Sequence, residues 1–305
     1  MIRWLLTLLA AFTFSGTALA ADDQGRFVEI AAAPSTQPAI APPHVTVWLP
    51  PGYDTSRQRY GVVYMQDGQN VFFPKRSAFG TVWAADKALL RLIAAKRVAP
   101  VIIVAIDNPG MARYRQYFPQ ALYAAAAPAL RKQFDALAQG PITGDAYVAF
   151  LTHDLKPLID RRFRTRRDAG HTAIVGSSMG GLISCYAFVR APTVFGKAAC
   201  VSTHWPLADP QDVGPFRPEL AAMWKGWFDA HLGVPRGRKL WMDHGTATLD
   251  AAYGPWQDAI DGDLTALGWR EGRDFVSRTY PGAAHEEKAW AARLDDIFAW
   301  LLARP

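Results

Sequence analysis

A serine in a glycine-rich segment is the residue of this sequence with the clearest chemical potential. Residues 176–180 read Gly-Ser-Ser-Met-Gly, a G-x-S-x-G pattern between a predicted apolar strand and a predicted helix. Strand, sharp turn and helix together are typical of a nucleophile elbow, whose strained turn exposes the serine hydroxyl and whose glycines let neighbouring chain pass closely. The pattern predicts Ser178 as a nucleophile and Ser177, at the variable position, as a packed residue. The alternative is an ordinary glycine-rich turn.

A serine hydroxyl needs a base within hydrogen-bond distance, most often a histidine, and the sequence has seven. His285 follows the last predicted strand, opens the C-terminal helix and comes after Ser178 in chain order, so we predict it as the base. His204 follows the next predicted strand after the elbow and is expected either to line the cleft or to pack. A zinc motif H-E-x-x-H would need a second histidine where Ala289 stands, so we expect no metal.

The third member of such a site is a carboxylate on the loop after the penultimate strand, which orients the imidazole. Two aspartates are candidates. Asp250 lies on the predicted loop, whereas Asp243 is close enough to the predicted strand to serve there as a hydrogen-bonding residue. We favour Asp250 and keep Asp243 as the alternative.

Acyl transfer also needs hydrogen-bond donors for the developing oxyanion. The amide of Met179, directly after the nucleophile, is predicted to be one donor. The second is predicted to be the amide of Gln69, because Gly68 in the segment 64–70 (Tyr-Met-Gln-Asp-Gly-Gln-Asn) permits a turn after the strand. The alternative is a simple Asp-Gly turn without this role.

These side chains must be positioned by a scaffold in which short apolar runs alternate with longer helical patterns. This alternation predicts βαβ units, a mostly parallel sheet covered on both faces, and working groups at the carboxyl ends of its strands. We expect one domain over residues 21–305. The predicted strands lie at 44–49, 60–65, 98–106, 171–175, 197–201, 239–242 and 275–280, and helices at 82–96, 145–163, 179–189, 251–267 and 286–302.

The composition is that of a globular protein, with 50% hydrophobic and 20% charged residues. The net charge of +6 is spread thinly, and the densest basic run, at 161–167, is short with one aromatic residue. We read this run as a solvated helix end and expect no nucleic-acid partner.

Residues 1–20 resemble a secretory signal: one arginine, an apolar stretch at 4–14, and the small-x-small sequence Ala-Leu-Ala at 18–20. The apolar stretch is shorter than a membrane span, so we expect cleavage near Ala21, export to the periplasm or outside, and no stable membrane insertion afterwards. The two cysteines, Cys185 and Cys200, lie in apolar segments and are expected to be buried, with a single bridge between them left open.

Six segments carry a family resemblance when they are taken together and in this order: VWLPPGY at 47–53, YMQDGQN at 64–70, AIDN at 105–108 with Arg113, DLKPLID at 154–160, GSSMGG at 176–181 and GAAH at 282–285. They resemble the putative esterase family of α/β hydrolases, which includes esterase D, feruloyl and acetyl xylan esterases, siderophore esterases and mycolyltransferases. The resemblance implies an α/β-hydrolase fold with a mostly parallel eight-stranded sheet, a Ser-His-Asp site with the amides of Met179 and Gln69, and no cofactor. One departure is that some members carry the acid where Thr248 stands here, so Asp250 requires a longer loop; a Ser-His dyad remains an alternative.

The leading expectation is an exported serine hydrolase of carboxylic esters, with a small-molecule or oligosaccharide ester, carbohydrate-linked or phenolic, as substrate. The alternatives are a siderophore trilactone esterase, an acyltransferase with the same triad, and a non-catalytic binding protein. We expect the segment 205–235, rich in aromatic residues, to be either a cap over the pocket or a helix packed on the domain. The residues expected to contact substrate are Asn70, Arg113, His204 and Trp205. The oligomeric state is left open.

Overall fold

An eight-stranded sheet organises the part of the chain that the computed structural model describes, residues 24–303. The strand order is β1-β2-β4-β3-β5-β6-β7-β8, with β1 and β2 antiparallel to their neighbours and the other strands parallel. The carboxyl ends of β3 to β8 therefore meet at one edge. The strands are β1 (Arg26–Ile30), β2 (Val45–Leu49), β3 (Gly61–Met65), β4 (Val101–Ile106), β5 (Thr172–Ser177), β6 (Lys197–Val201), β7 (Lys239–Gly245) and β8 (Phe275–Tyr280).

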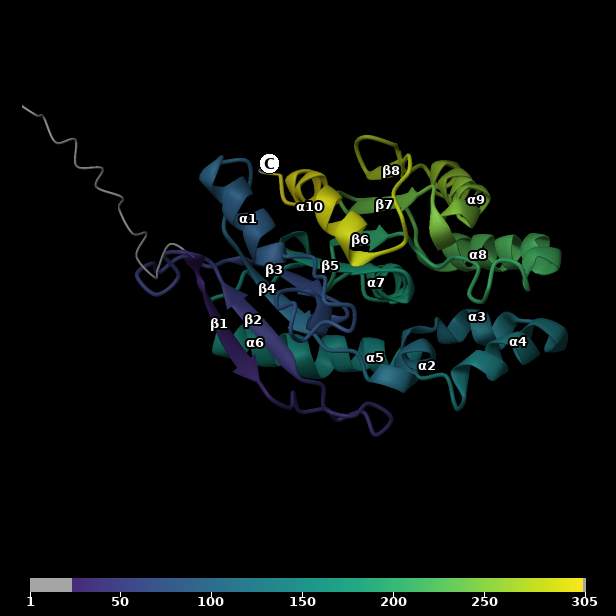
Figure 1. The fold of residues 1–305 in the computed structure, drawn as a ribbon, viewed down its shortest axis with the longest axis horizontal. Coiled ribbons are helices and arrows are strands. Elements are labelled where there is room, and N and C mark those ends of the chain that lie inside the picture. Colours follow the sequence, from purple (N-terminus) through teal and green to yellow (C-terminus); the bar gives the residue numbers. More distant parts are fainter. Residues whose placement is uncertain (1–23, 304–305) are drawn as a thin grey trace, which may run out of the picture.

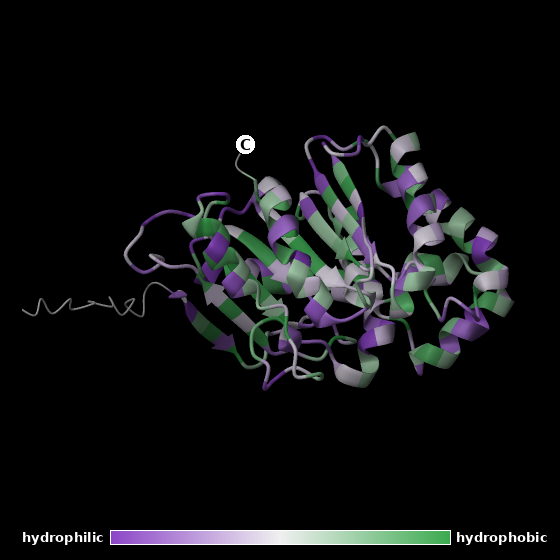
Figure 2. Cartoon of the chain, turned by 45° about the horizontal axis from the view of Figure 1, so that its top comes forward, coloured by the Kyte–Doolittle hydropathy of each residue, from purple (hydrophilic) through white to green (hydrophobic). Residues whose placement is uncertain are grey.

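The sheet separates two hydrophobic cores, as β4 shows most simply. All six residues of Val101–Ile106 are buried; the odd-numbered ones join one cluster and the even-numbered ones the other. Side chains alternate between the faces of a strand, so a strand covered on both faces must be apolar throughout. Figure 2 shows these hydrophobic strands between helices that carry hydrophilic residues as well.

Helices cover both faces of the sheet (Figure 1). Helices α1 (Ala85–Ala94) and α10 (Glu287–Leu301) lie side by side and pack their apolar residues against the strands in the smaller core. A π-helical segment, Phe150–Leu155, joins α5 to α6. The helices whose apolar residues join the larger core are α2 (Arg113–Tyr117), α3 (Gln120–Ala125), α4 (Pro128–Ala138), α5 (Gly144–Ala149), α6 (Lys156–Arg162), α7 (Met179–Arg190), α8 (Arg217–His231) and α9 (Gly254–Ala266).

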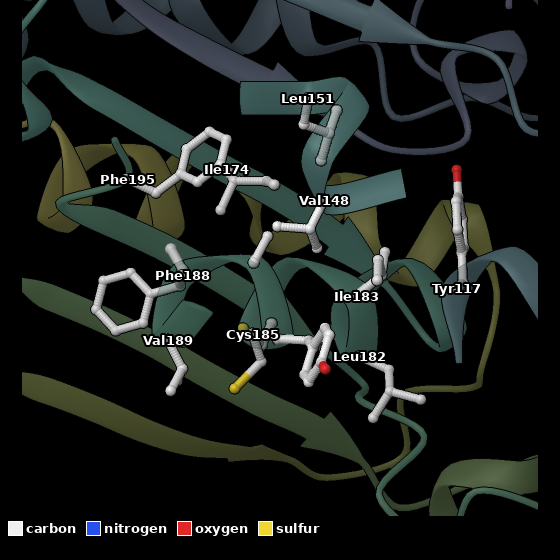
Figure 3. Packing of buried hydrophobic residues seen from close by; sticks show 14 of the residues in the cluster. Tyr117, Val148, Leu151, Ile174, Leu182, Ile183, Cys185, Phe188, Val189 and Phe195 are labelled. Carbon is white, nitrogen blue, oxygen red and sulfur yellow. The ribbon is translucent and has the colours of Figure 1, made fainter. Parts of the chain in front are cut away.

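Helix α7 is almost entirely buried: every residue from Met179 to Val189 is inside the protein. Figure 3 shows Leu182, Ile183 and Phe188 of this helix packed among residues of β5 and the α5 region. A helix that is apolar on all sides belongs in a core. Its Cys185 and the β6 residue Cys200 are buried and free in this structure.

The segment 205–235 contains α8, which packs against α9 and α3. Its aromatic residues Trp224, Trp227 and Phe228 are buried in the larger core. This packing favours the helix alternative for the segment, which stays a prediction.

Candidate active site

Ser178 occupies the turn between β5 and α7 with φ 56° and ψ −123°. A positive φ is strained for a residue with a side chain and is found where function requires it. The flanking glycines have a steric reason. A Cβ on Gly176 would lie 2.4 Å from the carbonyl oxygen of Gly180, and a Cβ on Gly180 would lie 2.6 Å from Oδ2 of Asp67. The geometry is that of a nucleophile elbow, with Ser178 partly exposed and Ser177 buried.

His285 and Asp250 meet at the same sheet edge. Nδ1 of His285 lies 2.6 Å from Oδ1 of Asp250, whose side chain is buried. The other carboxylate oxygen accepts hydrogen bonds from Ser202 Oγ, at 2.6 Å, and from the Gly245 amide, at 2.5 Å. Burial alone would raise the pKa of Asp250, but the hydrogen bonds from His285 and Ser202 outweigh it and the pKa lies below its usual value. Asp250 is thus an ionised partner for the imidazole.

Asp243 lies within β7, fully buried, and faces other partners. Its carboxylate accepts hydrogen bonds from Trp241 Nε1 at 2.6 Å and pairs with Arg293 Nη2 at 3.1 Å. Burial raises the pKa of Asp243 despite the nearby Arg293. The position beside His285 therefore belongs to Asp250.

Ser178 and His285 line one cavity of about 440 Å³, a size usual for small-molecule sites. No hydrogen bond joins their side chains within residues 24–303. The side chain of Ser178 instead contacts the hydroxyl of Tyr253, which also lies 2.6 Å from Nδ1 of His204. Nucleophile–base hydrogen bonds are often loose without substrate, so this arrangement is compatible with a catalytic pair.

The two predicted oxyanion donors have distinct settings. Met179 is the first residue of α7, where backbone amides have no acceptor within the helix. Gln69 lines the cavity from a single helical turn, Gly68–Asn70, after β3. A Cβ on Gly68 would lie 2.6 Å from the backbone nitrogen of Ile106, so glycine allows this turn to approach β4. The side chain of Gln69 is held by the amide of Asn108 at 3.1 Å.

Arg113, predicted to contact substrate, lines the cavity, but its charge is already paired. Its Nε and Nη2 donate to the two carboxylate oxygens of Asp67 at 2.6 and 2.7 Å, and Asn108 Nδ2 donates to the same carboxylate at 2.6 Å. Such a bidentate pair is among the strong, geometrically specific hydrogen bonds. Arg113 and Asp67 therefore hold the loops beside the elbow together, and Arg113 is not a free cation for an anionic substrate.

Of the other residues predicted to contact substrate, one lines the cavity and two do not. Asn70 lines the cavity and donates through Nδ2 to Glu287 at 3.0 Å. His204 is not among the cavity-lining residues; its backbone amide donates to the Ser178 carbonyl at 3.3 Å, and burial lowers the pKa of its imidazole to about 4. The prediction for Trp205 needs correction. It is 1% exposed, packs on Trp224 in the core and is not part of the cavity wall.

Several residues of the site were not identified from the sequence. Glu287 and Trp290 line the cavity, and Ser202 carries the hydrogen bond to Asp250. Two further residues of α10 donate hydrogen bonds to Ser202 Oγ. They are Trp290 and Arg293, three and six residues after Glu287. A spacing of three along a predicted helix places residues on one face, and this was the available signal.

The fold and the serine elbow at the edge of a mostly parallel eight-stranded sheet define an α/β hydrolase. The family model "Putative esterase" matches residues 40–301, and the chain belongs to this family. The fold and the family predicted from the sequence are thereby confirmed.

Two curated relatives match part of the chain. The uncharacterized protein YbbA of Bacillus subtilis is 26% identical over 52% of this chain and 56% of its own length. An endo-1,4-beta-xylanase/feruloyl esterase of Xylanibacter ruminicola is 27% identical over 55% of this chain and 21% of its own length. The aligned part of this chain thus spans about half of one relative and a fifth of the other.

Solved structures share the fold. An IroE-like serine hydrolase from Shewanella oneidensis superposes with a TM-score of 0.64 at 20% identity, covering 90% of this chain and 80% of that one. The feruloyl esterase module of Clostridium thermocellum, complexed with sinapinate, gives a TM-score of 0.61 at 17% identity over 92% and 89%. The enterobactin esterase of Shigella flexneri gives 0.59 at 16% identity over 91% and 60%.

Proposed function

We propose that the protein is a serine hydrolase of carboxylic esters that works through an acyl-enzyme. The observation that carries this proposal is Ser178 on a strained elbow, open to the same cavity as a histidine whose Nδ1 lies 2.6 Å from the buried Asp250. Membership of the esterase family supports the same reaction class.

In the proposed reaction, Ser178 Oγ attacks the ester carbonyl while Nε2 of His285 accepts its proton. The amides of Met179 and Gln69 stabilise the oxyanion, and His285 then gives the proton to the departing alcohol. Water repeats the sequence on the acyl-enzyme, releasing the acid. Asp250 keeps the imidazole in the tautomer that has its free lone pair toward Ser178.

For the substrate we propose a phenolic or other aromatic ester. Phe79, Trp83 and Trp290 line the cavity, and aromatic rings favour offset or edge contacts with another ring. Relatives of the fold named as feruloyl and enterobactin esterases are consistent with this choice. An acyltransferase would use the same groups, and transfer to added alcohols in competition with water would distinguish it.

We also propose export, on the signal-like sequence of residues 1–20, which lies outside the described residues. Over residues 24–303, no helix has both the length and the apolar character to cross a membrane.

The proposal is tested by ester hydrolysis and active-site labelling. Wild-type protein should hydrolyse a feruloyl or acetyl ester and react covalently with an organophosphate, and Ser178→Ala should lose both while keeping its circular dichroism spectrum. Ser177→Ala is the matched control, because the neighbouring hydroxyl is buried. Labelling that survives in Ser178→Ala and disappears in Ser177→Ala would contradict the proposal.

A further inference from the structure

Glu287 is an ionisable residue of the cavity that the proposed reaction does not use. It is the first residue of α10, two positions after His285, and lines the cavity together with Ser178 and His285. Only 6% of the residue is exposed. A buried carboxyl group usually has a cationic partner, because desolvating a lone charge is costly.

Within residues 24–303, no basic group lies within 4 Å of the Glu287 carboxylate, whose hydrogen bond comes from the neutral amide of Asn70 at 3.0 Å. The arginine that lines the cavity, Arg113, is engaged by Asp67 through two hydrogen bonds. Burial, together with the negative charge of Asp67, raises the pKa of Glu287, as expected for a carboxyl group without an ion pair.

The formal charges of the side chains in the cavity wall can therefore be added up. Asp67 and Arg113 cancel each other, and ionised Glu287 leaves one net negative charge beside the proposed nucleophile. A partly desolvated carboxylate attracts a cation or a hydrogen-bond donor and repels an anion more strongly than it would in water. Trp83 and Trp290, whose ring centroids are 5.8 Å apart, line the same cavity as Glu287. Their aromatic rings also favour a cation.

We infer that Glu287 determines the charge selectivity of this site, favouring esters that present a cationic or hydrogen-bond-donating group to α10 and disfavouring anionic esters. The inference rests on the proposed function and adds to it the class of substrate. Carboxylate-bearing esters, which a free Arg113 would have favoured, are then poor substrates.

Two series of esters with matched shapes test the inference at pH 8. The first varies the acyl group of p-nitrophenyl esters: 4-(trimethylammonio)butanoate, the neutral isostere 5,5-dimethylhexanoate, and the glutarate monoester. The second varies the alcohol of acetate esters: choline, 3,3-dimethylbutanol, and 3-hydroxypropanoate. In at least one series, wild-type kcat/KM for the cationic ester should exceed that for the anionic ester by about tenfold or more, which corresponds to about 1.4 kcal/mol.

Glu287→Gln should reduce this cation-to-anion ratio at least about fivefold, since glutamine can still accept the hydrogen bond from Asn70 but carries no charge. The ratio of the two kcat/KM values is the readout, because a general effect of the substitution on catalysis changes both rates alike and cancels in the ratio. Glu286→Gln is the matched control: it is the same chemical change one residue earlier, on an exposed side chain outside the cavity wall, and should keep the wild-type ratio.

Three results would overturn the inference: wild-type protein that hydrolyses anionic and cationic esters equally well in both series, an unchanged ratio in Glu287→Gln, or an equal change in Glu286→Gln. The first of these needs no variant, so the test holds even if Glu287→Gln does not fold. Hydrolysis of the neutral esters separates the two proposals. Its absence contradicts the proposed function, whereas neutral hydrolysis without charge discrimination contradicts the role of Glu287 alone.

Discussion

Asp250 and Asp243 are buried aspartates seven residues apart that both contact Ser202 but differ in their other partners. Asp250 accepts hydrogen bonds from Ser202 and Gly245 and lies 2.6 Å from His285. Asp243 is paired with Arg293 and with the indole of Trp241. Because a carboxylate can orient an imidazole only by direct contact, the geometry supports a catalytic role for Asp250 and a structural one for Asp243.

We therefore expect Asp250→Asn to lower kcat by up to about 10⁴-fold, because asparagine can hold the wrong imidazole tautomer. Asp243→Asn should cost far less in kcat for the folded protein. The effects of groups acting as one unit are strongly non-additive, so Asp250→Asn combined with His285→Ala should be little worse than His285→Ala alone. Steady-state kinetics on the four variants measure this. A large loss at Asp243 would transfer the role there, and small losses at both would indicate a Ser-His dyad.

The sequence marks Ser178 and His285 as candidates more clearly than the residues around them. Ser178 and His285 are marked by local pattern, strand order and chain order, all of which a sequence contains. Asp250 was only favoured over Asp243, because the choice depends on the course of the loop after β7. Trp205 was misplaced because an aromatic residue near a cleft and one in the core look alike in sequence; its burial against Trp224 follows from tertiary packing.

Helix α10 connects the active site with the core through residues spaced by three. Glu287 lines the cavity, Trp290 donates to Ser202 Oγ at 3.0 Å, and Arg293 donates to the same oxygen at 2.6 Å. Ser202 in turn donates to Asp250. The position of Asp250, the proposed catalytic carboxylate, thus depends on how this helix packs against β6 and β7.

Removing one member of the buried pair Arg293–Asp243 leaves an uncompensated buried charge. We expect Arg293→Met and Asp243→Asn each to lower the free energy of unfolding by about 3–5 kcal/mol, and the double variant to lose clearly less than the sum. Urea unfolding at pH 7 measures the cycle. Arg278→Met is the control, since its pair with Asp296 is about half exposed and should contribute under about 1 kcal/mol. Additive losses in the cycle would contradict the coupling.

At the level of elements, seven strands were placed by their apolar runs, and 197–201 and 275–280 coincide with β6 and β8. Strand β7 continues to Gly245, three residues past its predicted end. Asp243 and His244 are polar and break the local pattern, and their contacts with Arg293 and Thr279 come from other elements. Strand β1 was not located because it is a short edge strand, half exposed, with a weak hydrophobic pattern.

At the scale of the whole molecule, one sheet carries every group of the proposed site. The family match extends from residue 40 to 301, a range that includes the segment 205–235. Trp224, Trp227 and Phe228 of α8 belong to the same core as β3 to β7, which ties this segment to the sheet. We expect deletion of the segment to unfold the protein instead of opening the pocket.

That expectation is tested by replacing residues 209–235 with a short glycine-serine linker. Loss of the apolar area of three large aromatic residues, each contributing a few kcal/mol, is comparable to the whole stability of a domain. The variant should be insoluble or lack a cooperative thermal transition. A folded variant with faster hydrolysis of bulky esters would show instead that the segment acts as a cap.

The packed structure begins close to the predicted cleavage site. Trp48 Nε1 donates to the carbonyl of Gln24 and β1 begins at Arg26, so the packed structure starts only a few residues after the predicted cleavage site at Ala20–Ala21. A chain that begins at Ala21 should therefore keep the melting temperature and kcat/KM of the exported protein, and sequencing of the exported protein should find Ala21 or a close neighbour at its N-terminus.

A chain that begins at Pro34 lacks β1, exposes the edge of β2 to other chains and should be less stable and prone to aggregate. Intact residues 1–20 on protein that remains in the membrane fraction would contradict cleavage, while the effect of removing β1 would still be measured on the shortened chain.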